Sequence, residues 1–239
     1  MPGFSSAPMS IAPQGVAAPV KTDDPLVTAT TSPRLPLSAR LWGVDLNEGL
    51  PRVLTSEGIE VTPGDLSRVR DFLTVEFPGL GEETLGAAPS APIVDAKRWY
   101  LRTTCDVLEL RHAGKTVGVF VGAPEDWSSY YIRVLAILQN YQRPALRRRF
   151  TRECVFEPLA RHHVERVFAD SSPANLSMAR AFSEMQFHAT GHQLSDRWGP
   201  LVRYTKFLDP ACEAAFLRRF TSLAAGGGHT NSDGKEGSP

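Results

Sequence analysis

The chain has 239 residues, of which 42% are hydrophobic and 22% are charged, values typical of globular proteins and too polar for a membrane or fibrous class. Lysine plus arginine and aspartate plus glutamate balance at 26 each, so the chain as a whole offers no electrostatic footprint for nucleic acid. Its three cysteines, Cys105, Cys154 and Cys212, lack CxxC spacing and have an odd count, which predicts reduced thiols and not a disulfide framework.

The N-terminal segment carries no basic region, and Pro8, Pro13 and Pro19 interrupt its apolar residues, so a signal peptide is not predicted. No apolar run approaches the roughly 18 residues that a membrane helix requires. We therefore expect a cytoplasmic protein without a membrane partner.

Composition divides the chain into three parts. Residues 1–36 are dominated by Pro, Ala, Ser and Thr and predict a disordered leader, because such a segment buries too little apolar surface to offset its ordering entropy. Residues 222–239 are rich in Gly and Ser and predict a flexible tail. The folded domain is expected over residues 37–221.

The first expected elements are a short strand over residues 59–61 and a helix that follows it directly. Thr62 is expected to cap this helix, with Pro63 in its first turn, and the helix runs to about Phe77 because apolar residues recur there at helical spacing. A second helix is predicted over residues 96–104.

A hairpin is predicted next, with strands over residues 107–111 and 116–121 around the turn Ala113-Gly114. The segment 130–138 (YYIRVLAIL) is almost continuously apolar and rich in strand-forming residues. That pattern is typical of a central strand covered on both faces.

The C-terminal half alternates helices and strands. A helix is expected over residues 144–162, with Pro158 kinking or breaking it. The remaining expected elements are a strand at 164–169, a helix at 175–185, and two last strands at 187–194 and 201–208 around a turn at 196–200. Antiparallel hairpin strands followed by β-α-β-α-β predict a mixed α/β sheet with helices on both faces.

Three local patterns lie at corresponding points of this order. Strand 130–138 runs into Gln142-Arg143-Pro144-Ala145-Leu146-Arg147 at a helix start, and a second segment runs from Asn175 to Phe187. The third leads from Phe187 through Trp198-Gly199-Pro200 to Tyr204. Together, over residues 59–208, they resemble the GNAT (general N-acetyltransferase) superfamily. The resemblance implies a GNAT-like acyl-CoA N-acyltransferase fold with a mixed central sheet flanked by helices.

In that superfamily, the loop after the central strand binds the pyrophosphate of coenzyme A through backbone amides at the helix start, an arrangement that the helix dipole favours. By resemblance, the donor site here comprises Ile137, Leu138, Gln142, Arg143, Ala145, Leu146 and Arg147. Ala145 and Arg147 stand where the family has glycine and a small residue, which hinders close approach of a phosphate.

Arginines crowd the same helix start and leave two interpretations open. Guanidinium groups bind phosphate bidentately, so Arg143, Arg147 or Arg148 can supply the contact that the missing glycines do not. Alternatively, the run Arg147 to Arg149 forms a solvated helix face, and Arg149 is the weakest phosphate candidate.

The resemblance also implies roles for the helix at 175–185. Asn175 matches the family asparagine that contacts the pantetheine arm, and it also suits a helix cap. Phe182 occupies the position of a family tyrosine that often protonates the leaving thiolate, but it has no proton to donate and fits the core equally well. Gln186 replaces the usual glycine.

Residues for proton transfer are less clearly marked. Glu125 and Asp126 precede the central strand and can act through water, or they are ordinary loop acids. His188 and His192 are expected to share one face of a strand, where one can serve as a base or both are structural. The remaining candidate donors are Tyr130, Tyr131 and Tyr204.

A metal site is not expected, because adjacent His162 and His163 diverge on a helix and no further ligand lies at metal spacing. The sequence also lacks the motifs of serine hydrolases, P-loop NTPases and dinucleotide-binding dehydrogenases.

Two functions follow from these observations. The first is transfer of an acyl group from acetyl-CoA, another acyl-CoA or an acyl carrier protein to a small-molecule or peptide amine. A carrier-protein donor stays open because basic charge remains where the glycines are lost. The second is a catalytically inactive GNAT-fold module that acts as a binding or scaffold protein, for which lost glycines and a missing tyrosine are the expected signs.

Overall fold

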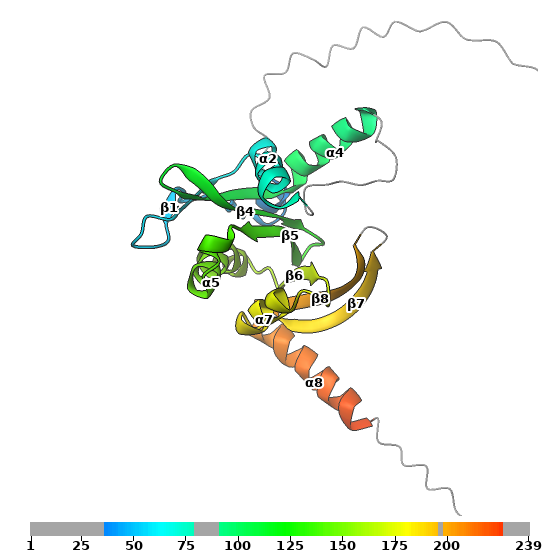
Figure 1. Cartoon of the computed structure of the whole chain (residues 1–239). Helices are drawn as coiled ribbons and strands as arrows, with labels where there is room; N and C mark the ends of the chain where they lie inside the picture. The colour runs from blue at the N-terminus through cyan, green and yellow to red at the C-terminus, as the bar shows by residue number, and fades with distance from the viewer. Residues whose placement is uncertain (1–35, 79–90, 196–197, 227–239) are drawn as a thin grey trace, which may run out of the picture. The chain divides into compact units, whose positions relative to one another are not determined.

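The structure is a computed structural model that describes residues 36–78, 91–195 and 198–226 (Figure 1). All of these residues belong to one compact unit, Arg34–Pro239. The leader expected over residues 1–36 lies outside the described residues except for Pro36, as do residues 227–239 of the expected tail and Asp196 and Arg197 of the expected turn.

One eight-stranded sheet forms the centre of this unit, in the order β1-β2-β3-β4-β5-β6-β8-β7. Strands β5 and β6 are parallel, and all other neighbours are antiparallel, so the expected mixed sheet is confirmed. The strands are β1 (Arg52–Val53), β2 (Glu60–Pro63), β3 (Asp106–His112), β4 (Lys115–Pro124), β5 (Ser129–Ile137), β6 (Arg166–Ser171), β7 (His188–Ser195) and β8 (Gly199–Phe207).

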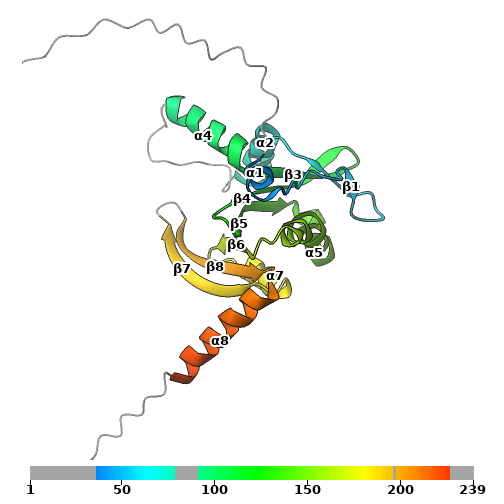
Figure 2. The same cartoon turned by 180° about the vertical axis from the view of Figure 1, so that it is seen from behind.

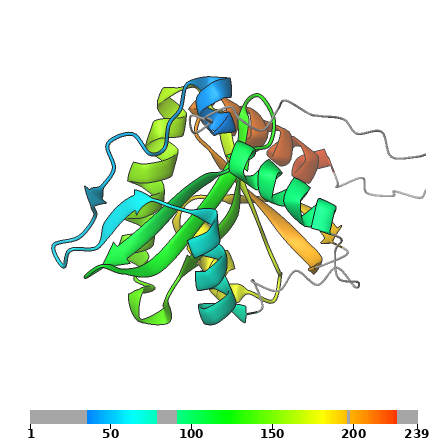
Figure 3. The same cartoon turned by 90° about the horizontal axis from the view of Figure 1, so that it is seen from above.

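Helices cover both faces of the sheet, α2 and α4 on one face and α5 and α7 on the other (Figures 1 and 2). Figure 3 shows α2 and α4 on the near side of the strands. The α-helices are α1 (Leu37–Trp42), α2 (Leu66–Glu76), α4 (Ala91–Thr104), α5 (Pro144–Thr151), α6 (Glu157–Arg161), α7 (Leu176–Glu184) and α8 (Pro210–Gly226). A 3-10 turn, η2 (Gln139–Tyr141), and a π-helical segment, η3 (Arg152–Phe156), complete them.

Each face has its own hydrophobic core. On the α5 and α7 side, Phe120, Tyr130 and Phe150 are fully buried and pack together with residues of the other strands and of α7. On the opposite side, Val69 and Leu73 of α2 pack on the alternate residues of β4 and β5. Covering on both faces explains the continuous apolar run of β5.

The hairpin is confirmed. Ala113 and Gly114 have φ values of 48° and 78°, the two positive values that a tight type I′ turn requires, and they join β3 to β4. The cap of α2 was wrongly assigned to Thr62. Asp65 is the cap, because its side chain accepts the amides of Ser67 (2.8 Å) and Arg68 (3.3 Å), while Pro63 ends β2.

The expected kink at Pro158 takes another form. Helix α5 continues into the π segment η3, and Pro158 lies in the first turn of α6 directly afterwards. A proline is tolerated there because the widened turn already lacks the regular α-helical hydrogen bonds. Helices α1 and α8 and strand β1 were not expected, and α8 runs to Gly226, past the start of the expected tail.

Candidate active site

Strands β5 and β6 part from one another halfway along their length. They pair with each other from Ser129 and Arg166 to Ile132 and Ala169. Beyond this point β5 continues to Ile137 and β6 to Ser171, but the two strands no longer pair with each other. Because the strands are parallel, their carboxyl ends lie at the same edge of the sheet, and α5 and α7 begin there. A gap bordered by two helix starts therefore opens in the sheet.

The register determines which backbone groups face this gap. Leu138 donates its N–H to Val117 O (2.9 Å), so the backbone of Leu138 faces β4. Backbone direction alternates along a strand, which turns Leu135 and Ile137 toward β6, where no strand pairs with them. Of the two expected strand residues, Ile137 lies on the gap side and Leu138 does not, whereas Leu135 was missed.

Gln142 closes part of the gap edge. Its side-chain amide donates to Ile137 O at 2.8 Å, so this carbonyl already has a partner. The N–H groups of Leu135 and Ile137 and the carbonyl of Leu135 are the strand groups left for a ligand.

The start of α5 leaves two amides without acceptors. Arg143 occupies the cap position without a side-chain cap bond, and Pro144 has no N–H. Arg143 N–H donates to Tyr141 O and Arg147 N–H to Arg143 O. Within the described residues, only the Ala145 and Leu146 amides of this turn remain free for an anion.

The basic side chains of this turn differ in availability. Arg143 holds both Glu57 oxygens at 2.6 and 2.7 Å, and Arg149 pairs with Glu153 at 2.9 Å. Burial lowers the pKa of Arg147, whose buried Nε has no hydrogen-bond partner among the described residues. Arg147 thus carries a buried donor without a partner in the same turn as the two free amides.

Asn175 caps α7, since its Oδ1 accepts the Met178 N–H at 3.1 Å. Its structural role is confirmed, and its side-chain amide stays exposed at the same edge as the α5 start. Phe182 is 6% exposed and packs on Phe187 and Tyr204, with ring centroids 5.0 and 4.6 Å away, so it is a core residue.

Tyr204 of β8 lies at the point where β5 and β6 separate. It pairs across β8 and β6 with Ala169, the last β6 residue that pairs with β5. Its ring contacts Phe182 of α7, which places its side chain on the α7 face. Within the described residues its hydroxyl makes no hydrogen bond, although it is not fully buried.

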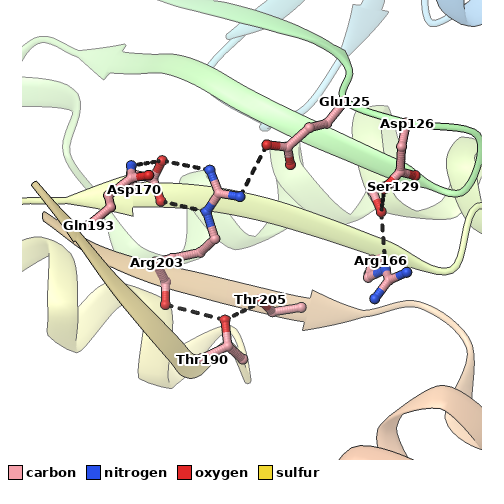
Figure 4. Close-up of polar contacts among 9 residues, drawn as sticks. All are labelled: Glu125, Asp126, Ser129, Arg166, Asp170, Thr190, Gln193, Arg203 and Thr205. Carbon is pink, nitrogen blue, oxygen red and sulfur yellow. Dashed lines mark hydrogen bonds and ion pairs between the residues drawn. The ribbon is translucent and has the colours of Figure 1, made fainter. Parts of the chain in front are cut away.

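An ion-pair network lies on the opposite face of the sheet (Figure 4). Arg203 holds both oxygens of Asp170, at 3.1 and 3.2 Å, and also donates to Glu125 at 3.1 Å. Asp170 also accepts from the Gln193 amide at 2.6 Å, so three strands meet at this carboxylate, and the β4–β5 loop joins them through the contact of Glu125 with Arg203. Arg203 and Asp170 were not identified from the sequence as site residues, because the alternation of polar and apolar residues along a strand does not show which polar residues interact.

The two loop acids are both engaged. Glu125 binds Arg203 but remains partly exposed, with 34% of its side chain accessible. Burial opposes ionisation of Asp126, yet hydrogen bonds from Ser128 and Ser129 outweigh it and lower its pKa. Tyr131 is on the same face, where burial, followed by neighbouring Asp170, raises its pKa to about 12. Of these three, Glu125 is the most exposed to solvent.

Tyr130 does not reach the gap. It is fully buried, and its hydroxyl donates to Asp106 at 2.9 Å, while Ser38 of α1 donates to the other Asp106 oxygen at 2.6 Å. Alternation along β5 turns Tyr130 into the core and Tyr131 to the other face. We therefore withdraw Tyr130 as a catalytic candidate.

The two histidines of β7 do not share a face, contrary to expectation. His188 pairs with Thr205 and His192 with Val202, and a bulge between Ala189 and Gly191 breaks the alternation. His188 binds Glu213 of α8 at 2.7 Å and contacts Phe207 and Phe216, which is a structural environment.

In the described part of the chain, no three His, Cys, Asp or Glu side chains group in a way that could hold a metal ion. Among the same residues, no helix combines the length and apolar character needed to cross a bilayer. The three cysteines are free thiols.

No protein-family model matches the sequence, and no curated protein matches it. Among solved structures, the chain is similar to a GNAT family acetyltransferase from Elizabethkingia anophelis with acetyl-CoA bound (11% identity, 64% of this chain, 99% of that chain, TM-score 0.45). It is also similar to an acetyl transferase from Salmonella typhimurium that modifies the N-terminal serine of a 50S ribosomal subunit protein (13%, 65%, 98%, 0.49). A third is an IAA acetyltransferase from Bacillus cereus (10%, 62%, 99%, 0.45). Likeness at this level assigns no activity to this chain.

Proposed function

We propose that this protein is a divergent GNAT-type N-acyltransferase that moves an acyl group from a phosphopantetheine thioester to an amine. The observation that carries the proposal is the gap between β5 and β6, bordered by the uncapped start of α5 and by the start of α7. Two free amides, a partly buried arginine and an exposed asparagine amide at one sheet edge suit a phosphate followed by an amide-bearing arm.

In this proposal the donor phosphate binds the amides of Ala145 and Leu146 with Arg147, and the pantetheine arm contacts Asn175 and the open edge of β5. The amine adds to the thioester carbonyl, and the oxyanion accepts the Leu135 N–H, which the register turns into the gap. Collapse of the intermediate breaks the C–S bond and releases a thiolate.

Tyr204 is the group that we assign to protonate that thiolate. Phe182 has no proton to give, and Tyr204 packs on it with a hydroxyl that has no partner among the described residues. The proton of the amine passes through water to Glu125, whose carboxylate is partly exposed beside Arg203. The donor is acyl-CoA or an acyl carrier protein, and the acceptor is a small-molecule or peptide amine.

Calorimetric titration with CoA and with acetylated phosphopantetheine tests the donor site, and mass spectrometry of an amine and peptide panel tests transfer. We expect binding of both donors and a mass gain of one acetyl group on an amine. Failure of both CoA and acetylated phosphopantetheine to bind the folded protein would overturn the proposal.

A second candidate is a binding module without catalysis, which the Gln142 contact to Ile137 O and the buried Phe182 favour. The double variant Arg147→Glu, Asn175→Ala separates the two functions. An enzyme loses turnover while remaining folded by circular dichroism, whereas a binding module shows no turnover in either form.

A further inference from the structure

A basic cleft continues from the start of α5 along the outer side of this helix. It has a volume of about 410 Å³ and is lined by α5 and η3, by the last residues of α7, and by β8. Ala145, which carries one of the two free amides, is one of its lining residues. The cleft therefore adjoins the proposed donor site.

Four cationic side chains line this cleft: Arg148, Arg149, Arg152 and Lys206. One acid, Glu184, faces them, and it pairs with Arg180 at 3.3 Å. Arg149 and Arg152 share Glu153 behind the cleft, and Arg152 also approaches Glu157. Arg148 makes no ion pair within the described residues, so its charge is free.

Gln186, which has an unusual backbone conformation, holds Lys206 in the cleft by a hydrogen bond. Gln186 follows α7 with φ of 61°, a left-handed conformation that a glutamine adopts at a cost. Its side chain accepts a hydrogen bond from Lys206 Nζ at 3.0 Å. Burial lowers the pKa of Lys206, against which Glu213 acts, so its ammonium gains from an anionic partner.

The donor site itself is small. Two amides and Arg147 can satisfy one phosphate, while Arg143, at the cap position of α5, is held by Glu57. Lys206 lies on β8, and the arginines of the cleft lie further along the helix, with Arg148 and Arg152 about 6 Å apart along its axis. This distribution fits an extended acidic surface beside a single phosphodiester.

We propose that the cleft docks an acidic carrier protein, which delivers its phosphopantetheine arm to the start of α5. The inference rests on the proposed function and names the donor. Long-range attraction between the exposed arginines and an acidic helix steers such a partner and makes its binding sensitive to salt.

Fluorescence anisotropy tests this without knowledge of the acceptor. The probes are a labelled acidic acyl carrier protein with its phosphopantetheine arm, the same protein without the arm, and CoA. The variants are Arg148→Glu and Lys206→Glu, and Arg102→Glu on α4 is the control because Arg102, like Arg148, is exposed and belongs to a helix on the other face. Thermal unfolding verifies that each variant folds.

The armed carrier is expected to bind the natural protein, to lose at least about tenfold in affinity with Arg148→Glu or Lys206→Glu, and to change less than about twofold with Arg102→Glu. The affinity for CoA is expected to fall much less than the affinity for the armed carrier in the two cleft variants and to stay unchanged in Arg102→Glu. An equal loss of CoA and carrier affinity in the cleft variants, or equal carrier binding in all variants, overturns the inference. Failure of both CoA and armed carrier to bind the natural protein overturns the proposed function itself.

Discussion

At the scale of single residues, Phe182 and Tyr204 form one contact, and in our proposal Tyr204 supplies the proton that Phe182 cannot. Phe182 is buried in the core, and the ring of Tyr204 lies 4.6 Å from it and carries a hydroxyl. The Phe182 position was identified from sequence through the resemblance of residues 175–187 to the GNAT superfamily. The proposed role of Tyr204 depends on strand register, which is determined only when β6 pairs with β8.

We expect Tyr204→Phe to lower kcat by about 10²-fold or more, the usual contribution of a positioned acid, while KM changes little because no binding group is lost. In the double variant Tyr204→Phe, Phe182→Tyr, the hydroxyl returns on the neighbouring ring and activity is expected to recover in part. Steady-state kinetics with acetylated phosphopantetheine measures both. Full activity of Tyr204→Phe would remove Tyr204 from the mechanism.

Asp106 is a second residue-scale case, since it is a fully buried carboxyl group between Ser38 and Tyr130. Burial raises its pKa to about 6, although both hydroxyl donors act in the other direction. The folded protein therefore holds this proton more tightly than the unfolded chain, whose aspartate pKa is about 3.9. Its contribution to stability is largest below pH 4 and is lost as pH rises to about 6.

A shift of this size corresponds to about 3 kcal/mol of unfolding free energy. We expect Asp106→Asn to be more stable relative to the natural protein at pH 7.5 than at pH 4.5, as measured by urea unfolding. Asp126→Asn is the control, because hydrogen bonds lower the pKa of Asp126, so its stabilisation is lost only below about pH 4 and the difference from the natural protein should change little between pH 4.5 and 7.5. A pH-independent difference for Asp106→Asn would show that Asp106 does not titrate in this range.

At the scale of elements, helices and strands with strong periodicity were predicted from sequence, and weakly packed ones were not. Strand β5 was found because both of its faces are buried, whereas β1 has only two residues. Helix α8 went unnoticed although Asp209, which accepts the Ala211 amide at 2.8 Å, and Pro210 form a helix start. The π segment has no signature in the sequence, because it arises from packing.

The uncapped start of α5 allows a test in which stability and binding separate. A carboxylate in the first turn favours the helix dipole but repels a phosphate. Ala145→Asp is therefore expected to keep or slightly raise the unfolding temperature, and to weaken CoA or phosphopantetheine binding by at least about tenfold. Ala211→Asp, at an exposed alanine in the first turn of α8, is the matched control. Equal weakening by both substitutions would argue against a phosphate site at α5.

At the scale of the whole molecule, the sequence indicated which elements meet at the site but not which atoms face it. The β-α-β-α-β pattern predicted a mixed sheet, and the parallel pairing of β5 with β6 places the starts of the helices after them at one edge. Three details were not accessible: the length of pairing between β5 and β6, the bulge in β7 that separates His188 from His192, and the ion pair that occupies Arg143. Each depends on contacts between residues far apart in the chain.

A ligand that binds only the folded chain must stabilise all of it, and this gives a test that requires no acceptor. At a concentration of 100 times its Kd, a phosphopantetheine donor adds about 2.7 kcal/mol to the free energy of unfolding. For a folded unit of this size, each kcal/mol raises Tm by about 2–4 °C, so a total rise of about 5–10 °C is expected. Scanning calorimetry with CoA, armed carrier and inorganic phosphate measures it.

Inorganic phosphate at equal concentration should give a smaller rise, because it cannot reach the open edge of β5. The same rise with phosphate alone would mean that the α5 start binds anions without the arm, and the gap between β5 and β6 would then have no part in donor binding.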